Sequence, residues 1–308
     1  MKHIPVLLDE IIFSLELKPG MNVVDCTIGD AGHAEGILKV TAPHGSLLGI
    51  DADPESLLRA KQFLYEYGHR VTLVRSNFSK FSSILDEEKF GPVHAVLLDL
   101  GWSTQQFKER GRGFSFEKDE ALDMRYDKQS TEEFYGMSCP TAADLLNRLA
   151  EKEIADIFKS YGEEALNKEI AAAVLEYRRN KEIALTGELV DIIGRVYKKK
   201  LGSKKDIPWI GGIHPATKVF QALRIAVNQE LTMLERVLPQ AIDRLESRGR
   251  LAVISFHSLE DGIVKHFFKR QQGKTLNIVY KKPIRASEDE LERNPSARSA
   301  KLRVAEKL

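Results

Sequence analysis

The sequence predicts an α/β fold of the Rossmann-like type, in which an all-helical domain interrupts a mostly parallel sheet. Short apolar strands alternate with helical segments from residue 22 to residue 98. The pattern then becomes purely helical from about residue 141 to residue 200, and a buried type of strand returns at residues 251–256. Alternating strands and helices are typical of parallel sheets covered by helices. We therefore expect a sheet domain over residues 1–110 and 214–308, and a helical insertion over residues 111–213.

Composition and length are typical of a globular protein of this kind. The chain has 308 residues, of which 43% are hydrophobic and 30% charged, and its formal net charge is +1. Such balance indicates neither disorder nor a membrane protein. Two cysteines, Cys26 and Cys139, provide no disulfide framework, no zinc-ligand spacing and no nucleophilic setting, so we expect no metal site. An apolar stretch at residues 4–8 stops at Asp9, too early for a signal peptide, and a cytoplasmic location is expected.

The first strand and the turn after it form the most informative stretch. Apolar residues 21–24 lead into a glycine-rich turn, Asp25-Cys26-Thr27-Ile28-Gly29-Asp30-Ala31-Gly32-His33, and a second strand at residues 46–50 ends in Asp51. This pattern is a βαβ unit whose carboxyl edge suits a nucleotide-type cofactor. Further strands are expected at residues 71–75 and 95–98, with a helix over 54–67. Taken alone, Gly29 and Gly32 fit equally well a tight strand-to-helix turn without a ligand.

The charge of the turn favours one cofactor over another. Carboxylates at Asp25 and Asp30 would repel the pyrophosphate of a dinucleotide, which binds to bare backbone N–H groups. S-adenosylmethionine has no phosphate, and its ammonium and sulfonium groups are attracted by carboxylates. Asp51 is placed to accept hydrogen bonds from a ribose diol. We therefore expect S-adenosylmethionine as the cofactor, with Asp25, Gly29 and Asp51 at its site.

Two later strand ends provide candidate catalytic residues. Asp99 follows the fourth strand, where a carboxylate could accept a hydrogen bond from an amine that takes up a methyl group. A turn-capping role is the alternative for Asp99. His257 and Ser258 follow the fifth strand and could position a substrate base, although Ser258 with Asp261 fits a helix cap. A Ser–His–Asp hydrolase is disfavoured because these residues lie too close together along one turn.

Basic and aromatic residues around the insertion are candidates for RNA contact. Guanidinium groups at Arg110 and Arg112 could bind phosphates, and the rings of Phe114 and Phe116 could stack on bases. A small core beneath the loop is the alternative for each ring. A lysine cluster that includes Lys199 and Lys204 could also contact a polyanion, although such clusters are usually solvated helix ends.

Local signals predict several further elements. Thr141 and Asp144 have the spacing of a capping box at a helix start. A long helix is expected from about residue 215, with Pro239 ending it and opening another. Residues 276–280 and 302–305 are expected to pair as a final antiparallel hairpin.

The chain closely resembles the bacterial small-subunit ribosomal RNA cytosine N4-methyltransferases, the family called RsmH or MraW. The resemblance runs nearly end to end and includes an RGFSF segment, an LDMR segment and an SFHSLED segment. The matching residues are 3–8 with Glu10, 25–33, 51–54, 77–78, 99–101 with Gln106, 112–116, 122–125, 214–217, 220–225, 253–261 and 297–303.

The resemblance implies a class I S-adenosylmethionine-dependent methyltransferase that methylates the exocyclic N4 of a cytosine in the decoding region of 16S ribosomal RNA. The small ribosomal subunit is then the substrate, and the helical insertion recognises RNA. By the same resemblance the RGFSF and HSLED segments line the RNA side. Arg125 is a further candidate for RNA contact. The cofactor positions that carry over are Ala31, Gly32, His33, Asp51, Phe78, Asp99 and Gln106.

The sequence departs from the family pattern at the first turn. The family usually has two adjacent glycines before the histidine, whereas here Asp30 and Ala31 precede Gly32. If position 31 requires a positive φ, alanine is strained there, and cofactor affinity is the property affected. Thr104, Ala121 and Tyr126 also differ from the usual residues, and none of them is a proposed catalytic group.

Three competing functions are open to test. A DNA amino-methyltransferase commonly carries two prolines and an aromatic residue after the acid, and the prolines are absent after Asp99. A dehydrogenase that uses NAD is disfavoured by the acidic turn. A catalytically silent RNA-binding or ribosome-binding relative is compatible with the altered turn. Monomer and homodimer are both compatible with the sequence, and no membrane partner is expected.

Overall fold

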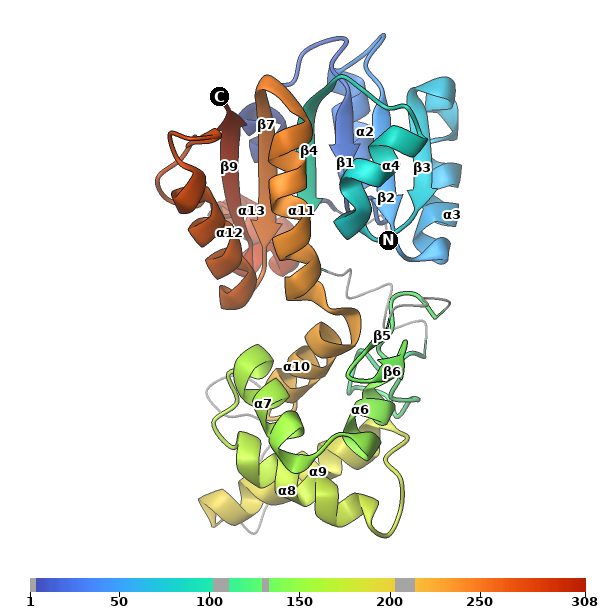
Figure 1. Cartoon of the computed structure of the whole chain (residues 1–308), viewed down its shortest axis with the longest axis vertical. Coiled ribbons are helices and arrows are strands. Elements are labelled where there is room, and N and C mark those ends of the chain that lie inside the picture. Colours follow the sequence, from blue (N-terminus) through green and yellow to red (C-terminus); the bar gives the residue numbers. More distant parts are fainter. Residues whose placement is uncertain (1–3, 102–110, 129–132, 203–213) are drawn as a thin grey trace. The chain divides into compact units, whose positions relative to one another are not determined.

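The computed structural model describes residues 4–101, 111–128, 133–202 and 214–308. The chain divides into two compact units, residues 1–101 with 231–308, and residues 102–230 (Figure 1). The second unit is wider at both ends than the insertion expected over residues 111–213. Helix α10 (Thr217–Asn228) belongs to it because Val219, Phe220 and Leu223 pack into the helical core.

The first unit contains a seven-stranded sheet in the order β3-β2-β1-β4-β7-β9-β8. Five strands are parallel, and β9 runs antiparallel to both β7 and β8. The expected hairpin between residues 276–280 and 302–305 is therefore confirmed. The carboxyl ends of the parallel strands meet at one edge, where ligands of such sheets bind. The strands are β1 (Val23–Asp25), β2 (Leu47–Asp51), β3 (Val71–Arg75), β4 (Val93–Asp99), β7 (Leu245–Ser255), β8 (Leu276–Ile278) and β9 (Lys301–Lys307).

Helices cover both faces of this sheet, as Figure 1 shows. Successive strand residues alternate between two cores: Val23 packs with the helices of one face, and Val24 packs with those of the other. Burial on both faces explains why the strands read as continuous apolar runs. On the first face lie α1 (Leu8–Ser14), α2 (Gly32–Val40), α3 (Pro54–Phe63) and α13 (Glu288–Arg293); on the second lie α4 (Phe81–Glu87), α11 (Glu230–Arg244) and α12 (Ser258–Gln271).

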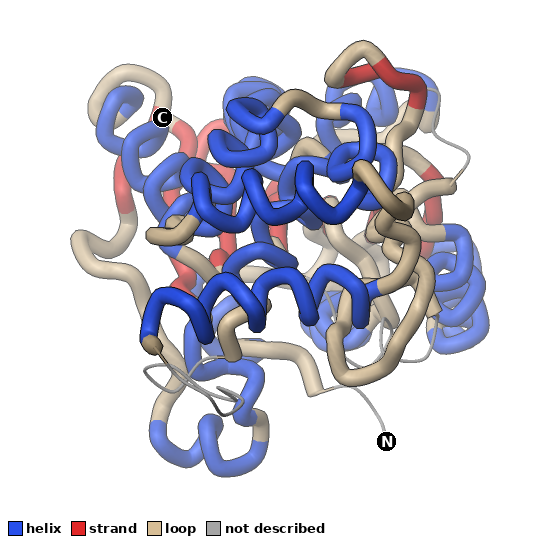
Figure 2. Tube along the Cα trace, turned by 90° about the horizontal axis from the view of Figure 1, so that it is seen from below, coloured by secondary structure: helices blue, strands red, loops and turns tan. Residues whose placement is uncertain are grey.

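The second unit consists mainly of helices (Figure 2). These helices pack on a single apolar core. The predicted capping box starts α6: the Asp144 N–H donates to Thr141 Oγ1 at 3.0 Å, and Asp144 Oδ2 accepts from the Thr141 N–H at 3.0 Å. Among the described residues of both units, none of the helices is long and apolar enough to cross a membrane. The elements are β5 (Glu133–Phe134), β6 (Met137–Ser138), α6 (Ala142–Arg148), α7 (Glu151–Gly162), α8 (Asn167–Arg178), α9 (Thr186–Leu201) and α10.

Two expected helices end earlier than the sequence suggested. The helix expected over residues 54–67 stops at Phe63, and a 3-10 helix, η1 (Tyr65–Arg70), follows it. The prediction that a helix from residue 215 runs to Pro239 is wrong. Helix α10 ends at Asn228 because Gln229 has a left-handed backbone with φ 50°. Helix α11 then continues through Pro239, where apolar packing of its inner face on the sheet offsets the missing N–H.

Candidate active site

The turn after β1, residues 26–31, has a backbone that favours glycine at two positions. Gly29 has φ 49°, and Ala31 has φ 65° and ψ 22° immediately before α2. Ala31 is fully buried. The left-handed conformation costs an alanine roughly 1 kcal/mol relative to glycine. The positive φ suspected at position 31 is thus present, and this turn holds alanine in it.

Thr27 joins the ends of β1 and β4 at the centre of the sheet. The Asp99 N–H donates to Thr27 Oγ1 at 2.7 Å, and the Thr27 N–H donates to Asp25 Oδ1 at 3.0 Å. These bonds hold the backbone of Asp99 against the first turn. The sequence pattern did not predict this role of Thr27, although an aspartate commonly accepts from the backbone N–H two residues later, as Asp25 does here.

Asp51 lies at the end of β2, as predicted, and connects this strand to the first turn. Its Oδ2 accepts from the Gly29 N–H at 3.0 Å, and its Oδ1 accepts from the Asp53 N–H at 2.8 Å. A carboxylate has about four acceptor positions, the chemistry that a pair of hydroxyl groups requires. The position and the acceptor chemistry of Asp51 both suit a ribose diol.

His33 lies near the start of α2 and contacts both the N-terminal segment and β4. Its Nε2 lies 2.8 Å from the carbonyl oxygen of Val6, and its Nδ1 lies 3.6 Å from Asp99 Oδ2. Gly32 packs tightly beside it, because a Cβ there would come within 3.3 Å of the Pro5 ring. The Leu7 N–H donates to Glu290 Oε1 at 2.8 Å. Residues 5–7 therefore lie against the start of α2, which the strand and helix pattern alone did not predict.

Carboxylates dominate the electrostatics of this edge; Asp25 is buried, and Asp51 and Asp99 are partly buried. Burial raises the pKa of Asp25 to about 6; His33 and the Thr27 backbone oppose this increase, whereas the charges of Asp99 and Asp51 add to it. Burial lowers the pKa of His33, so its ring is neutral at pH 7. Burial is the main cause of both shifts, and the charges of Asp99 and Asp51 add to the shift of Asp25. A cationic ligand beside these carboxylates would be favoured.

Asp30 and Cys26, which lie in the same turn, add little to its negative charge. Asp30 lies 2.7 Å from Arg59 Nε, so its charge is matched and contributes less against phosphate than we expected. Repulsion of a phosphate group would therefore come chiefly from Asp25, Asp51 and Asp99. Burial raises the pKa of the Cys26 thiol, which keeps it protonated and agrees with the expectation that it is no nucleophile.

Phe78 follows β3 at the same edge of the sheet. It begins the 3-10 helix η2 (Phe78–Lys80), which Asn77 caps by accepting from the Ser79 N–H at 2.9 Å. The Phe78 ring is partly buried against the core. Gln106 and the RNA candidates Arg110 and Lys204 lie outside the residues that the structure describes.

The turn after β7 lies beside the end of β4, since Asp99 pairs with Ile254 across the two parallel strands. The expected cap by Ser258 with Asp261 is wrong. His257 precedes the helix with extended backbone, and its Nδ1 accepts from the Glu260 N–H at 3.4 Å. Glu260 Oε2 in turn accepts from the Phe256 N–H at 2.9 Å. A role for His257 or Ser258 in base positioning stays a prediction.

Asp261 faces basic side chains on β9 instead of capping the helix. Arg303 Nε donates to its Oδ1 at 2.6 Å, and Lys301 Nζ donates to its Oδ2 at 3.2 Å. Burial alone would raise the pKa of Asp261, but the Arg303 hydrogen bond and the nearby positive charges outweigh it and lower the pKa. In this turn the negative charge of Asp261 is therefore neutralised by the basic side chains beside it.

Several RNA candidates serve the fold of the second unit. Arg112 is buried and donates to the carbonyl oxygen of Tyr126 at 3.1 Å, and the buried Phe114 ring stacks on Tyr126. Phe116 stacks on the imidazole of His214 with ring centroids 4.5 Å apart. The alternative that Phe114 and Phe116 form a small core beneath the loop therefore agrees with these contacts. RNA contact by these residues stays a prediction.

The two remaining candidates of that unit differ in exposure. Arg125 Nε donates to Asp123 Oδ1 at 2.7 Å, and Arg125 Nη2 donates to Asp123 Oδ2 at 2.9 Å. Lys199 is exposed in the last turn of α9. Of the two, Lys199 presents the more accessible charge for a phosphate, and its RNA contact also stays a prediction.

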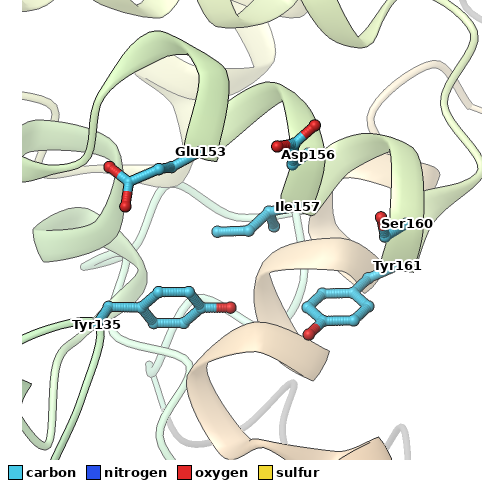
Figure 3. A pocket seen from close by; sticks show the side chains of 6 residues that line it. All are labelled: Tyr135, Glu153, Asp156, Ile157, Ser160 and Tyr161. Atoms are coloured by element: carbon cyan, nitrogen blue, oxygen red, sulfur yellow. The ribbon is translucent and has the colours of Figure 1, made fainter.

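A shallow pocket of about 220 Å³ lies in the helical unit (Figure 3). Tyr135 and Tyr161 face each other across it, and Glu153 and Asp156 lie on its rim. Burial, followed by the nearby Tyr161, raises the pKa of Tyr135. Acidic side chains at the rim would repel phosphate groups, so the pocket is poorly suited to the RNA backbone.

Comparisons with known proteins find relatives that match the chain over nearly its full length. The ribosomal RNA small subunit methyltransferase H of Heliobacterium mobile is 42% identical over 323 residues, which cover 99% of each chain. The protein of the same name from Syntrophobacter fumaroxidans is 41% identical, covering 100% of this chain and 97% of that one. A solved S-adenosylmethionine-dependent O-methyltransferase from Thermotoga maritima aligns with all of this chain and 68% of its own, at 10% identity and a TM-score of 0.43. That likeness is too distant to bear on function.

The model of one protein family matches the whole chain. The match spans residues 1–308, and the family is described as the MraW methylase family. Full-length relatives at more than 40% identity point to the same family. The chain therefore belongs to the MraW methylase family and is a methyltransferase.

Proposed function

We propose that this protein transfers a methyl group from S-adenosylmethionine to the exocyclic N4 of a cytosine in small-subunit ribosomal RNA. The observation that carries the proposal is the convergence of Asp25, Asp51 and Asp99 at one sheet edge. Their mutual repulsion contributes to the raised pKa of Asp25. A cationic cofactor relieves that repulsion, whereas a phosphate-bearing cofactor increases it.

The residues at this edge fit the proposed cofactor. Asp51 would accept hydrogen bonds from the ribose hydroxyl groups, and Asp25 would favour the positively charged part of the molecule. Phe78 and the turn around Ala31 and Gly32 border the same edge. When bound, S-adenosylmethionine supplies an electrophilic methyl group on its sulfonium.

Asp99 is the candidate catalytic residue on the protein side. Its carboxylate would accept a hydrogen bond from the acceptor amine and so orient the nitrogen lone pair. Thr27 holds the Asp99 backbone in place through its hydroxyl group. Most of the rate enhancement is then expected from positioning, because displacement at a sulfonium needs in-line geometry more than strong base catalysis.

The substrate side of the proposal rests on the relatives. Proteins at 41–42% identity carry the name ribosomal RNA small subunit methyltransferase H. We propose that the helical unit recognises 16S ribosomal RNA in the small subunit, with the exposed Lys199 contacting phosphate. The resemblance of this chain to the cytosine N4-methyltransferases supports N4 as the acceptor atom.

Labelled methyl transfer to small ribosomal subunits that lack this modification tests the proposal. The RNA is digested after the reaction, and its nucleosides are identified by mass. Labelled N4-methylcytidine is the expected product with wild-type protein, and a surface variant, Asp86→Asn, should produce the same amount. Label on another atom would overturn the cytosine N4 assignment. Binding of S-adenosylmethionine without any transfer would favour a silent RNA-binding relative.

A further inference from the structure

The hydrogen bond at Nε2 fixes the tautomer of His33. Nε2 lies 2.8 Å from the Val6 carbonyl oxygen. A carbonyl oxygen only accepts hydrogen bonds, so Nε2 must carry the hydrogen. The neutral ring then presents an unprotonated Nδ1.

That Nδ1 is directed towards the candidate catalytic carboxylate. It lies 3.6 Å from Asp99 Oδ2, slightly longer than a hydrogen bond. A nitrogen lone pair and a carboxylate oxygen repel each other unless a proton lies between them. The pair is therefore arranged to share one additional proton. Catalytic hydrogen bonds are often long before substrate binds and shorten in the complex.

The surroundings of His33 are suited to both charge states. Its side chain is nearly inaccessible to solvent, and burial lowers its pKa, which keeps the ring neutral before reaction. Three acidic groups face it: Asp25 from β1, Asp99 from β4 and Glu290 from α13. Their negative charges stabilise an imidazolium once a proton arrives, which offsets the unfavourable burial of that cation.

We propose that His33, acting through Asp99, takes up at Nδ1 the proton that the acceptor amine loses on methylation. This inference rests on the proposed function. The amine nitrogen bonds to the methyl carbon while the carbon–sulfur bond breaks, and that electron pair remains on sulfur. The nitrogen keeps the electron pair of its N–H bond, and the proton passes to Asp99 Oδ2 and then to His33 Nδ1. The imidazolium finally returns the proton to solvent, and no oxidant or reductant is needed.

His33 does not touch the acceptor in this scheme and is a positioning residue for Asp99. The hydrogen bond to Val6 does not by itself distinguish this role from a structural one or from cofactor contact, because all of them are compatible with it. These roles differ in their pH dependence, because only the relay requires an unprotonated Nδ1 during the reaction.

His33→Gln is the informative variant, because its amide N–H can still donate to the Val6 carbonyl while the side chain no longer takes up a proton. We expect the single-turnover rate of wild type at saturating S-adenosylmethionine to decline at acidic pH, at values lower than the ordinary histidine pKa of about 6.5, because burial lowers the pKa of His33. His33→Gln should be at least about 10-fold slower at pH 7.5 and should lack that decline. Asp25→Asn is the control, because Asp25 titrates nearby. If His33 causes the decline, this variant should still show it, at a lower pH than wild type, because the Asp25 charge raises the pKa of His33.

If His33→Gln has the same rate and the same pH dependence as wild type, proton transfer from Asp99 to His33 is refuted. Cofactor affinity is measured separately by calorimetry, so a loss of binding is distinguished from a loss of proton uptake.

A second measurement applies even if the variant does not fold. Nitrogen-15 NMR of histidine-labelled wild-type chain should show His33 protonated at Nε2 alone at pH 7.5. A hydrogen at Nδ1 would contradict the proposal whatever the activity. Absence of methyl transfer in wild type would instead refute the proposed function and leave the tautomer result standing.

Discussion

The turns after β1 and β7 lie at the same edge of one sheet but treat acidic side chains in opposite ways. After β7, Asp261 contacts Arg303 and Lys301, and its pKa is lowered. After β1, Asp25 is buried among other carboxylates and a neutral histidine, and its pKa is raised to about 6. In the β7 turn, basic side chains neutralise the charge of Asp261. In the β1 turn, the carboxylates lie close together, and a cationic ligand would neutralise them.

The largest expected effect concerns Asp99, whose carboxylate belongs to the acidic group. Asp99→Ala should abolish turnover, a loss of at least about 100-fold, because the acceptor amine loses its hydrogen-bond partner. Single-turnover methyl transfer measures the effect, and circular dichroism verifies the fold. Unchanged turnover in a folded Asp99→Ala protein would refute the catalytic role of Asp99.

Asp25→Asn should stabilise the protein at pH 7 while weakening cofactor binding. The folded pKa of Asp25 is raised from 3.8 to about 6, so the folded state binds the proton more tightly than the unfolded state. Wild-type stability should therefore fall as pH rises from about 4 to 6, by roughly 3 kcal/mol from this group. The variant removes that slope and should gain about 1–3 kcal/mol at pH 7. Urea unfolding at several pH values measures the stability and its slope, and calorimetric titration measures the cofactor affinity. A variant with the wild-type slope would contradict the account.

Asp261→Asn is the matched substitution in the β7 turn, and its effect should have the opposite sign. It removes the charge from hydrogen bonds with Arg303 and Lys301, and about 1–3 kcal/mol of stability at pH 7 should be lost. The lowered pKa means that this contribution is present above the unfolded value of 3.8 and is lost as pH falls through the folded value. Cofactor affinity should remain within about threefold of wild type. A stabilised Asp261→Asn protein would remove the contrast between the turns.

Ala31→Gly should have the smallest effect. Glycine relieves roughly 1 kcal/mol of left-handed strain, but it removes a buried methyl group and adds unfolded-state entropy. These terms oppose each other, so stability should change by less than about 1 kcal/mol. Affinity for S-adenosylmethionine should change less than about threefold, because the turn already has its left-handed backbone. A much larger gain in affinity would show that alanine distorts the site.

Local sequence patterns predicted the parts of the site that depend on strand ends. Asp25, Asp51 and Asp99 each close an apolar strand, and parallel strands bring their carboxyl ends together. The final hairpin was predictable for the same reason, because its two segments have strand patterns. Acidic residues at these ends also indicated the charge of the cofactor.

Contacts between distant segments were not predictable in this way. The bond between His33 and Val6 depends on how the N-terminal segment packs, and Glu290 joins it from the other end of the chain. The end of α10 depends on the left-handed backbone of Gln229, a conformation that a glutamine in the sequence does not predict. His257 caps α12 although serine at the next position is the commoner cap.

Calorimetric titration of S-adenosylmethionine in buffers of different ionisation enthalpy tests the central claim most directly. If the β1 turn stores negative charge, a bound cation lowers the pKa of Asp25. Binding at pH 6 should then release about half a proton, since Asp25 is about half protonated there, and release should fall almost to zero at pH 8. Asp25→Asn should release much less at pH 6. Proton uptake, or no proton exchange at pH 6 despite binding, would contradict the account.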